Sequence, residues 1–487
     1  GLQWALVQRR HGERADSGPA AARRAGGLRD GLMDRLPFEL TAGQQKVLSL
    51  ISAELAATRP MHRLLQGEVG SGKTIVSVLA MAQMVDAGYQ CALLAPTEVL
   101  AAQHAQSIRS VLGPLGMAGQ LGGDECATRV ALLTGSMTAA QKRDVRDEVS
   151  SGAAGIVIGT HALLHEAVQF ADLAFVVIDE QHRFGVEQRG VLTDKATARP
   201  HVLVLTATPI PRSVAMTIFG DLDVSTLDEL PAGRQPVGTV VVDAALRPAW
   251  VERAWQRVAE EVAQGRQAFV VVPRINSSDE GVGVVELAER LSAGPLAGVR
   301  VGVLHGQLPS EAKEATMAAF AAGEVDVLVV TTVIEVGVDV PNATMMVIWD
   351  AERFGISQLH QLRGRIGRGE HPGVCLLISS AMGQKSALVE DTIRQRLEAV
   401  AATNDGFELA ELDLLQRREG DVLGAEQSGS RSSLRLLSVL EHADVITQAK
   451  EIAAEAVRRD PERMTPGFVD AVVATEQLMA GDFLELS

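Results

Sequence analysis

Short runs of mainly apolar residues recur through the first half of the chain and alternate with stretches in which apolar residues return every three or four positions. The runs lie at 63–66, 91–95, 155–159, 174–178 and 201–205. Runs of this length are typical of strands buried on both faces, and strands that alternate with helices are typical of a parallel sheet. The pattern predicts a first α/β domain over residues 36–229.

A second series of the same kind follows a stretch at 230–236 whose Pro and Gly content is typical of a linker. Its apolar runs lie at 268–272, 299–303, 326–330, 345–349 and 374–378. We therefore expect a second, similarly built domain over residues 230–384.

The two ends of the chain lack this alternation. Residues 1–35 are rich in Ala, Arg and Gly and have weak periodicity, so we interpret them as a loosely ordered linker or as the remnant of a region further upstream. From residue 385 to 487 the strand signal is lost and helices are expected. The predicted fold class is α/β, with two parallel-sheet domains followed by a mainly helical C-terminal segment.

The composition fits a multidomain intracellular protein. A chain of 487 residues has room for two to four domains with large cores. The three cysteines, Cys91, Cys126 and Cys375, lie far apart without metal-ligand spacing, which indicates small apolar side chains in a reducing compartment. No stretch reaches the length of an apolar membrane span, and residues 1–35 lack the apolar centre of a signal peptide. We expect a cytoplasmic protein with no membrane partner.

The strongest chemical signal is the segment 67–74, which reads Gly-Glu-Val-Gly-Ser-Gly-Lys-Thr and matches the phosphate-binding P-loop at every fixed position. A strand is predicted before it and an apolar helix after it, which is the context that the motif requires. Backbone N–H groups of such a loop converge on phosphate oxygens, while the lysine reaches the β/γ-phosphates and the threonine holds magnesium. The nucleotide-binding candidates here are Gly67, Gly70, Ser71, Gly72, Lys73 and Thr74.

An acid pair follows the apolar run at 174–178. Ligands gather at the carboxyl ends of parallel strands, so Asp179 is placed to bind magnesium through water and Glu180 to orient or polarise the attacking water. Acid pairs at strand ends also occur as simple turn formers. The P-loop upstream favours the catalytic interpretation.

Two further segments carry candidate chemistry. The run at 201–205 ends in hydroxyl side chains, including Thr206 and Thr208, which we interpret as a coupling element. In the segment 359–369, Gln361, Arg365 and Arg368 are spaced to lie on one face of a helix. They form a candidate arginine-finger cluster; the alternative is a solvated basic face, although Gly364 and Gly367 are costly in a surface helix.

These elements, in this order, resemble the superfamily 2 helicases and translocases, which couple ATP hydrolysis to movement on nucleic acid. Five more segments resemble motifs of that superfamily: 38–44, 95–100, 158–161, 303–306 and 331–341. The residues of segments 36–41, 179–188 and 351–365 resemble those of one branch, the RecG-type branched-DNA helicases. The resemblance extends from about Leu36 to Leu486.

The resemblance implies two tandem RecA-like P-loop NTPase domains with ATP and Mg²⁺ between them. It implies a catalytic set of Lys73, Asp179, Glu180, Gln361, Arg365 and Arg368. It adds Phe38, Gln44, Gly337 and Asp339 to the nucleotide-binding residues. It assigns DNA contact or coupling to Thr97, Thr160, His182, Thr206, Thr208, Thr332, Arg417 and Gln427, the last two in a C-terminal loop that links ATP state to DNA movement.

The implied function is an ATP-dependent translocase on duplex DNA that remodels branched DNA, by branch migration and reversal of stalled forks, in recombination and repair. Branched or duplex DNA is the expected partner, a single-stranded-DNA-binding protein is a further candidate, and a monomer is expected. RecG-type proteins carry an oligonucleotide-binding wedge domain before the motor, and nothing in 1–35 resembles it. We therefore expect these residues alone to show little preference for forked over linear duplex DNA.

Two other functions stay open on the sequence. A translocase of the transcription-repair coupling type has a similar motor, but its acidic motif usually has an acid where this chain has Gln181. A nucleotide-binding structural module without hydrolysis is disfavoured by the intact Lys73 and Glu180. The net charge of −16 does not exclude DNA, because a translocase needs only a local basic track, and with 3% aromatic residues we expect contact with duplex phosphates over base stacking.

Overall fold

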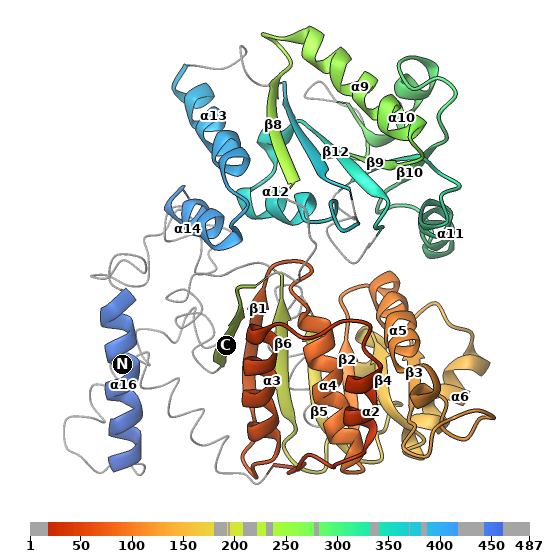
Figure 1. Cartoon of the computed structure of the whole chain (residues 1–487), viewed down its shortest axis with the longest axis vertical. Helices are drawn as coiled ribbons and strands as arrows, with labels where there is room; N and C mark the ends of the chain where they lie inside the picture. The colour runs from red at the N-terminus through yellow and green to blue at the C-terminus, as the bar shows by residue number, and fades with distance from the viewer. Residues whose placement is uncertain are drawn as a thin grey trace. The chain divides into compact units, whose positions relative to one another are not determined.

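The computed structural model describes residues 18–179, 192, 195–207, 222–229, 237–276, 282–331, 340–369, 371–380, 387–416 and 443–460. The chain divides into two compact units, the first built mainly from residues before 230 and the second mainly from residues 230–413. Each unit contains one sheet covered by helices (Figure 1). The two predicted α/β domains are therefore present.

The sheet of the first unit has seven strands in the order β3-β4-β2-β5-β6-β1-β7, and the pairings between them are all parallel. The strands are β1 (His62–Gly67), β2 (Gln90–Leu94), β3 (Arg129–Leu133), β4 (Ala154–Gly159), β5 (Leu173–Asp179), β6 (His201–Thr206) and β7 (Asp223–Leu227). Five of them coincide with the predicted apolar runs. The two outermost strands, β3 and β7, were not predicted: β7 has a weak apolar pattern, whereas β3 contains the apolar run 130–133, which the prediction overlooked.

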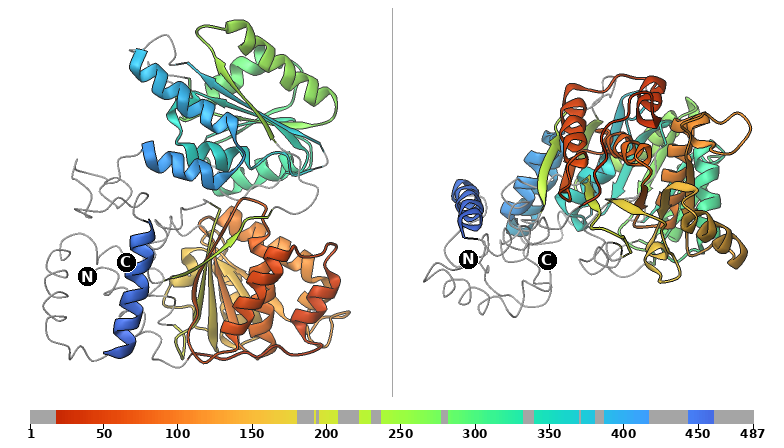
Figure 2. Two further views of the ribbon diagram at one scale, coloured as in Figure 1. Left: turned by 60° about the vertical axis from the view of Figure 1, so that its left-hand side comes forward. Right: turned by 90° about the horizontal axis from the view of Figure 1, so that it is seen from below.

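Helices cover this sheet, and α2, α3 and α4 form one layer in front of it in Figure 1, also visible in Figure 2. The helices of the unit are α2 (Leu28–Arg35), α3 (Ala42–Leu55), α4 (Lys73–Asp86), α5 (Glu98–Leu112) and α6 (Ala139–Ser150), with short 3-10 helices η1 (Gly113–Gly116) and η2 (His161–Leu164). Thr41 and Thr138 begin α3 and α6 with capping boxes, which explains where these helices start.

Residues 18–35 are not a loose linker, contrary to expectation. Leu28 and Leu32 of α2 are fully buried. The N-terminus of α2 is capped by a residue distant in sequence: the carboxylate of Asp86, at the end of α4, accepts hydrogen bonds from the backbone N–H groups of Leu28 (2.6 Å) and Arg29 (3.1 Å). A Cβ on Gly27 would lie 2.3 Å from Asp86 Oδ1, so glycine is needed there. The sequence pattern did not predict α2, because its apolar periodicity is weak and its N-terminal cap comes from Asp86, which is distant in sequence.

The sheet of the second unit has six parallel strands in the order β10-β11-β9-β12-β13-β8. The strands are β8 (Val237–Asp243), β9 (Gln267–Val271), β10 (Val301–Leu304), β11 (Val327–Val330), β12 (Ala343–Trp349) and β13 (Gly373–Ser379). Five match the predicted series, and β8 was not predicted. The helices are α9 (Pro248–Ala263), α10 (Val284–Ala293), α11 (Ser310–Ala321), η5 (Ala351–Arg353), α12 (Ile356–Arg363) and α13 (Ala387–Ala402).

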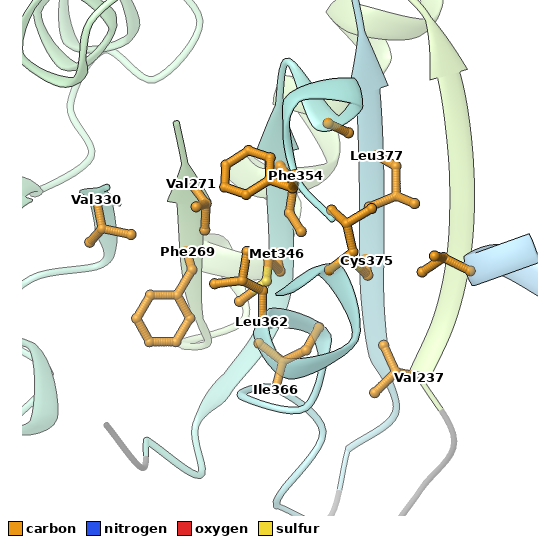
Figure 3. Packing of buried hydrophobic residues seen from close by; sticks show 14 of the residues in the cluster. Val237, Phe269, Val271, Val330, Met346, Phe354, Leu362, Ile366, Cys375 and Leu377 are labelled. Atoms are coloured by element: carbon orange, nitrogen blue, oxygen red, sulfur yellow. The ribbon is translucent and has the colours of Figure 1, made fainter. Parts of the chain in front are cut away.

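One core of this unit lies between the sheet and α12. Phe269 and Met346 point from neighbouring strands toward Leu362 of α12 and the following Ile366 (Figure 3). Phe269 also packs against Phe320, with ring centroids 4.8 Å apart. These contacts fix α12 and the residues directly after it on the sheet.

The described residues beyond 385 are helical or connect helices, as predicted. They form α13, α14 (Gly406–Gln416) and α16 (Ala443–Arg459). In the described part of the chain no helix has the length and apolar character needed to span a bilayer. Cys91 and Cys375 are buried free thiols, and burial raises the pKa of Cys375 to about 12, which agrees with an inert packing role.

Candidate nucleotide-binding site

The carboxyl ends of the first sheet bring the predicted residues to one edge, because parallel strands end on the same side. The P-loop follows β1, Thr206 ends β6 and Asp179 ends β5. On the other side of β5, Thr97 follows β2 and Thr160 follows β4. The nucleotide-binding candidates thus occupy the β1–β6–β5 half of the edge, and two DNA-contact candidates occupy the adjoining β2–β4 half.

The P-loop has the predicted strand-loop-helix context. β1 ends at Gly67, and α4 begins at Lys73 with Gly72 as its N-cap. Gly70 and Gly72 both have φ of +86°, a conformation that favours glycine. A Cβ on Gly72 would lie 2.2 Å from Gln44 Nε2, so this position also needs glycine for close approach. The N-terminus of α4 therefore faces the loop with the partial positive charge that suits phosphate.

Lys73 and Ser71 provide polar groups inside this loop. Lys73 is nearly buried, and its Nζ donates to the carbonyl oxygen of Gly67 at 2.7 Å, so the lysine arches over the loop. The Ser71 hydroxyl is buried and has no hydrogen-bond partner among the described residues. A buried hydroxyl without a partner and a buried ammonium group in the same loop suit an anionic ligand, so the residues present fit a nucleotide phosphate.

Gln44 holds the loop to α3. Its Nε2 donates to the carbonyl of Ser71 (2.8 Å) and its Oε1 accepts from the N–H of Thr41 (3.0 Å), while the side chain is almost fully buried. Phe38, by contrast, is 53% exposed. The role of Phe38 and Gln44 in adenine recognition stays a prediction; the structure gives Gln44 the role of fixing the P-loop to the start of α3.

Asp179 is held by a residue that sequence reasoning missed. His104 Nε2 lies 2.8 Å from Asp179 Oδ2, and the two side chains are 11% and 14% exposed. His104 lies on the buried face of α5 with Leu100, Ala101 and Ile108. The sequence does contain a signal for this contact: His104 falls on the apolar face of a helix that begins in the strand-end motif 95–100.

The spacing of the strands fits magnesium bound through water. Since β6 lies between β1 and β5, the ends of β1 and β5 are about 10 Å apart at a strand spacing of ~4.8 Å. This separation of the strand ends leaves room for a hydrated ion near Asp179, as Mg²⁺ keeps several waters. Within the described ranges, no group of three or more acidic, histidine or cysteine side chains could hold a metal directly. The donor set thus fits a magnesium ion that completes its shell with water and phosphate.

The three threonines at this edge either make a hydrogen bond within the protein or are largely shielded from solvent. The Thr97 hydroxyl oxygen caps α5 by accepting from the N–H of Leu100 at 3.3 Å. Thr160 and Thr206 are nearly buried at the ends of their strands. Contacts of these three residues with DNA or in coupling stay predictions.

The arginine cluster of the second unit differs from the prediction. α12 ends at Arg363 and Gly364 is its C-cap, so Arg365 and Arg368 lie beyond the helix and do not share one helical face with Gln361. Gly367, with φ of +69°, turns the chain again. The helix prediction was wrong because Gly364 ends the helix where spacing alone continued it. The finger role of the arginines stays a prediction.

Arg363, next to this cluster, is structural. Its guanidinium donates to the carbonyls of Val400 (2.6 Å) and Thr403 (2.8 Å) and lies 2.9 Å from His360 Nδ1. Burial lowers the pKa of Arg363. It therefore ties α12 to the end of α13 and does not belong to an exposed basic track.

The remaining predicted site residues lie outside the described residues and keep the status of predictions: Glu180, His182, Thr208, Thr332, Gly337, Asp339, Arg417 and Gln427.

Family models match three successive parts of the chain. Residues 41–217 match the DEAD/DEAH box helicase model, 251–370 match the helicase conserved C-terminal domain, and 403–477 match the model of ATP-dependent DNA helicase RecG, domain 3, C-terminal. The chain matches the motor and C-terminal part of RecG-type helicases.

Individual RecG proteins agree with this match. The chain is 64% identical over 469 residues to the ATP-dependent DNA helicase RecG of Mycobacterium tuberculosis (strain ATCC 25618 / H37Rv), a match that covers 94% of this chain and 63% of the relative. It is 44% identical to the RecG of Synechocystis sp. over 487 residues, covering 99% of this chain and 56% of the relative. The chain thus spans less than two thirds of the length of these RecG proteins.

A solved structure of RecG bound to a three-way DNA junction is also similar. The TM-score is 0.71 at 37% sequence identity, and the similarity covers 91% of this chain and 55% of the other. The tandem parallel sheets described above are therefore those of the RecG motor fold.

Proposed function

We propose that this chain is an ATP- and magnesium-dependent motor that moves on duplex DNA and remodels branched DNA. The observation that carries the proposal is the carboxyl edge of the first sheet, which combines a P-loop of the correct geometry with Asp179 and with the adjoining Thr97 and Thr160. A nucleotide site and a nucleic-acid contact surface on one sheet edge are what a DNA-coupled ATPase requires.

In this proposal each residue of the nucleotide site has a stated task. Lys73 supplies positive charge to the β/γ-phosphates, and Thr74 and Asp179 hold the hydrated metal. Glu180 polarises the attacking water. Arg365 and Arg368 stabilise the charge that develops on the transferred phosphoryl group. Magnesium, when bound, neutralises charge on the phosphate oxygens.

The DNA substrate is proposed from similarity. The similar RecG structure is bound to a three-way DNA junction, so we propose branched DNA as the substrate here, with work in recombination and repair. We further propose a monomer in the cytoplasm, with a single-stranded-DNA-binding protein as a candidate partner. The alternative of a translocase that acts on stalled transcription predicts movement on linear duplex DNA without action on a junction.

The test combines ATP hydrolysis with DNA remodelling. Phosphate release is measured without DNA, with linear duplex DNA and with a three-way junction of equal nucleotide content, at one fixed salt concentration. Conversion of a labelled junction is followed in parallel. The proposal expects DNA-stimulated hydrolysis and ATP-dependent junction conversion. Hydrolysis that no DNA stimulates would contradict the motor, and stimulation without junction conversion would contradict the branched substrate for this chain.

A further inference from the structure

The hydrogen bond between His104 and Asp179 joins two elements that are distant in sequence. His104 lies in α5 and Asp179 is the last residue of β5, 75 positions later. The distance of 2.8 Å between Nε2 and Oδ2 is that of a charge-assisted hydrogen bond, and both side chains are largely shielded from water. A contact of this kind fixes the orientation of both groups.

The chemistry of the pair assigns the donor. An ionised carboxylate only accepts hydrogen bonds, so the Nε2–H of His104 donates to Oδ2 of Asp179. This contact engages Oδ2 and restricts rotation of the carboxylate. Oδ1 then points to a defined direction, as needed for a carboxylate that orders water around a metal ion.

The position of α5 gives the contact a second consequence. α5 begins directly after Thr97, which follows β2, and β2 pairs with both β4 and β5. Thr97 and His104 are seven residues apart, so they lie on the same side of the helix, about 10 Å apart along its axis. His104 therefore lies about two turns after Thr97 and reaches from α5, which packs against β3 and β4, to the carboxylate at the end of β5.

We propose that His104 is a positioning residue that orients Asp179 for magnesium and couples DNA contact at the start of α5 to the metal site. This inference rests on the proposed function, because it takes Asp179 as the magnesium-binding carboxylate and Thr97 as a DNA contact. A shift of α5 on DNA contact would move Nε2 relative to Oδ2 and so change how well Asp179 orders the hydrated ion.

Three variants of α5 separate positioning from packing. His104→Leu removes the donor and keeps an apolar side chain of moderate size. His104→Gln keeps an N–H donor at nearly the reach of Nε2, whereas Gln106→Leu changes an exposed residue of the same helix and serves as the matched control. Thermal unfolding of each variant reports whether the first unit remains folded.

The first measurement needs no hydrolysis. Binding of a fluorescent ATP analogue is titrated with Mg²⁺ and with EDTA, and the ratio of the two dissociation constants gives the tightening due to magnesium. We expect His104→Leu to reduce this tightening about tenfold, the usual effect of losing a group that orients a metal ligand, with little change in EDTA. His104→Gln and Gln106→Leu should keep most of it.

The second measurement concerns coupling. Phosphate release is measured against magnesium concentration, with and without duplex DNA. His104→Leu should raise the half-saturating magnesium concentration about tenfold and reduce the factor by which DNA stimulates hydrolysis, and His104→Gln should restore both.

The outcomes distinguish the inference from the function on which it rests. If the wild-type chain shows no magnesium-dependent tightening or no DNA stimulation, the proposed function fails. If the wild type shows both and His104→Leu, still folded, keeps both, the positioning role is overturned. If His104→Leu does not fold, His104→Gln decides in combination with His104→Asn, whose shorter amide cannot reach Asp179. Equal behaviour of these two variants would show that the histidine serves packing alone.

Discussion

The two sheets share parallel topology but use their carboxyl edges differently. In the first unit this edge carries glycines with positive φ, a buried lysine and an orphaned hydroxyl, an arrangement suited to a ligand. In the second unit the described residues that follow β12 include Asp350 and Glu352, and each has a buried carboxylate oxygen without a hydrogen-bond partner in the described residues. The comparison teaches that the strand ends of one architecture can carry a glycine-rich candidate phosphate site in one unit and buried carboxylates in the other.

In the second unit the candidate catalytic arginines lie directly after the C-terminus of α12. Arg365 and Arg368 follow α12, and Ile366 between them packs into the core. Asp350, the only non-glycine residue with positive φ among those described, makes the turn from β12 toward η5 and α12. After β12 the chain thus passes through η5 and α12 to the arginines.

The largest loss of ATP hydrolysis should come from a change in the P-loop of the first unit. Lys73→Ala removes the ammonium group that arches over the P-loop, so we expect ATP hydrolysis to fall by about 10³ or more. Steady-state phosphate release measures it, and unchanged thermal unfolding serves as the control. Hydrolysis at the wild-type rate would mean that the nucleotide site lies elsewhere.

Arg363 and Arg368, five residues apart in the second unit, should differ in whether they affect stability or catalysis. Arg368→Ala should lower kcat by roughly 10³ with little change in ATP binding, as for a group that acts in the transition state. Arg363→Ala should instead destabilise the unit by about 2 kcal/mol or more, since it removes the donor to the buried carbonyl of Val400 and to the partly buried carbonyl of Thr403. Denaturant unfolding and kinetics on both variants test this; swapped effects would reverse the two assignments.

The buried carboxyl group of Glu352 should make the stability of the second unit depend on pH. Burial, aided by the negative charge of Asp350, raises the pKa of Glu352 above its unfolded value of 4.5. The folded state therefore holds a proton that the unfolded state releases, and stability is lost as pH rises from about 4.5 through the raised pKa. Glu352→Gln should remove this slope and raise Tm at pH 7 by on the order of 2 °C. The exposed Glu289→Gln is the control, and identical pH profiles for wild type and Glu352→Gln would refute the prediction.

The first unit should show the opposite slope, with the smallest effect. His201 is buried; its Nδ1 accepts from the N–H of Met61 (2.9 Å) and its Nε2 donates to the carbonyl of Pro19 (2.5 Å), an arrangement that needs the neutral ring. Burial lowers the pKa of His201 below 6.5. The stability that it contributes is complete above about pH 6.5 and declines as pH falls toward the lowered pKa. Thermal unfolding between pH 7.5 and 5.5 should show this decline in the wild type and a flatter profile in His201→Asn.

Features that depend on residues close together in the sequence were predicted correctly, whereas contacts between residues distant in the sequence were missed. The buried strands and the P-loop were predictable because apolar runs and glycine spacing are local. The ordered packing of 18–35 was not, since Asp86 and His201 supply its hydrogen bonds from far along the chain. The contact of His104 with Asp179 was missed for the same reason. The end of α12 was mispredicted although a local signal for it, Gly364, was present in the sequence.

The place of β1 in its sheet has a consequence for synthesis on the ribosome. β1 pairs only with β6 and β7 among the described strands, and these end at Thr206 and Leu227. The strand that leads into the P-loop therefore has no neighbour until more than 130 further residues have been made. At about 5–20 residues per second this delay is roughly 7–30 s, during which the apolar residues of β1 depend on chaperones or transient contacts for protection. A nascent chain released before β6 emerges would present the P-loop sequence without a nucleotide site.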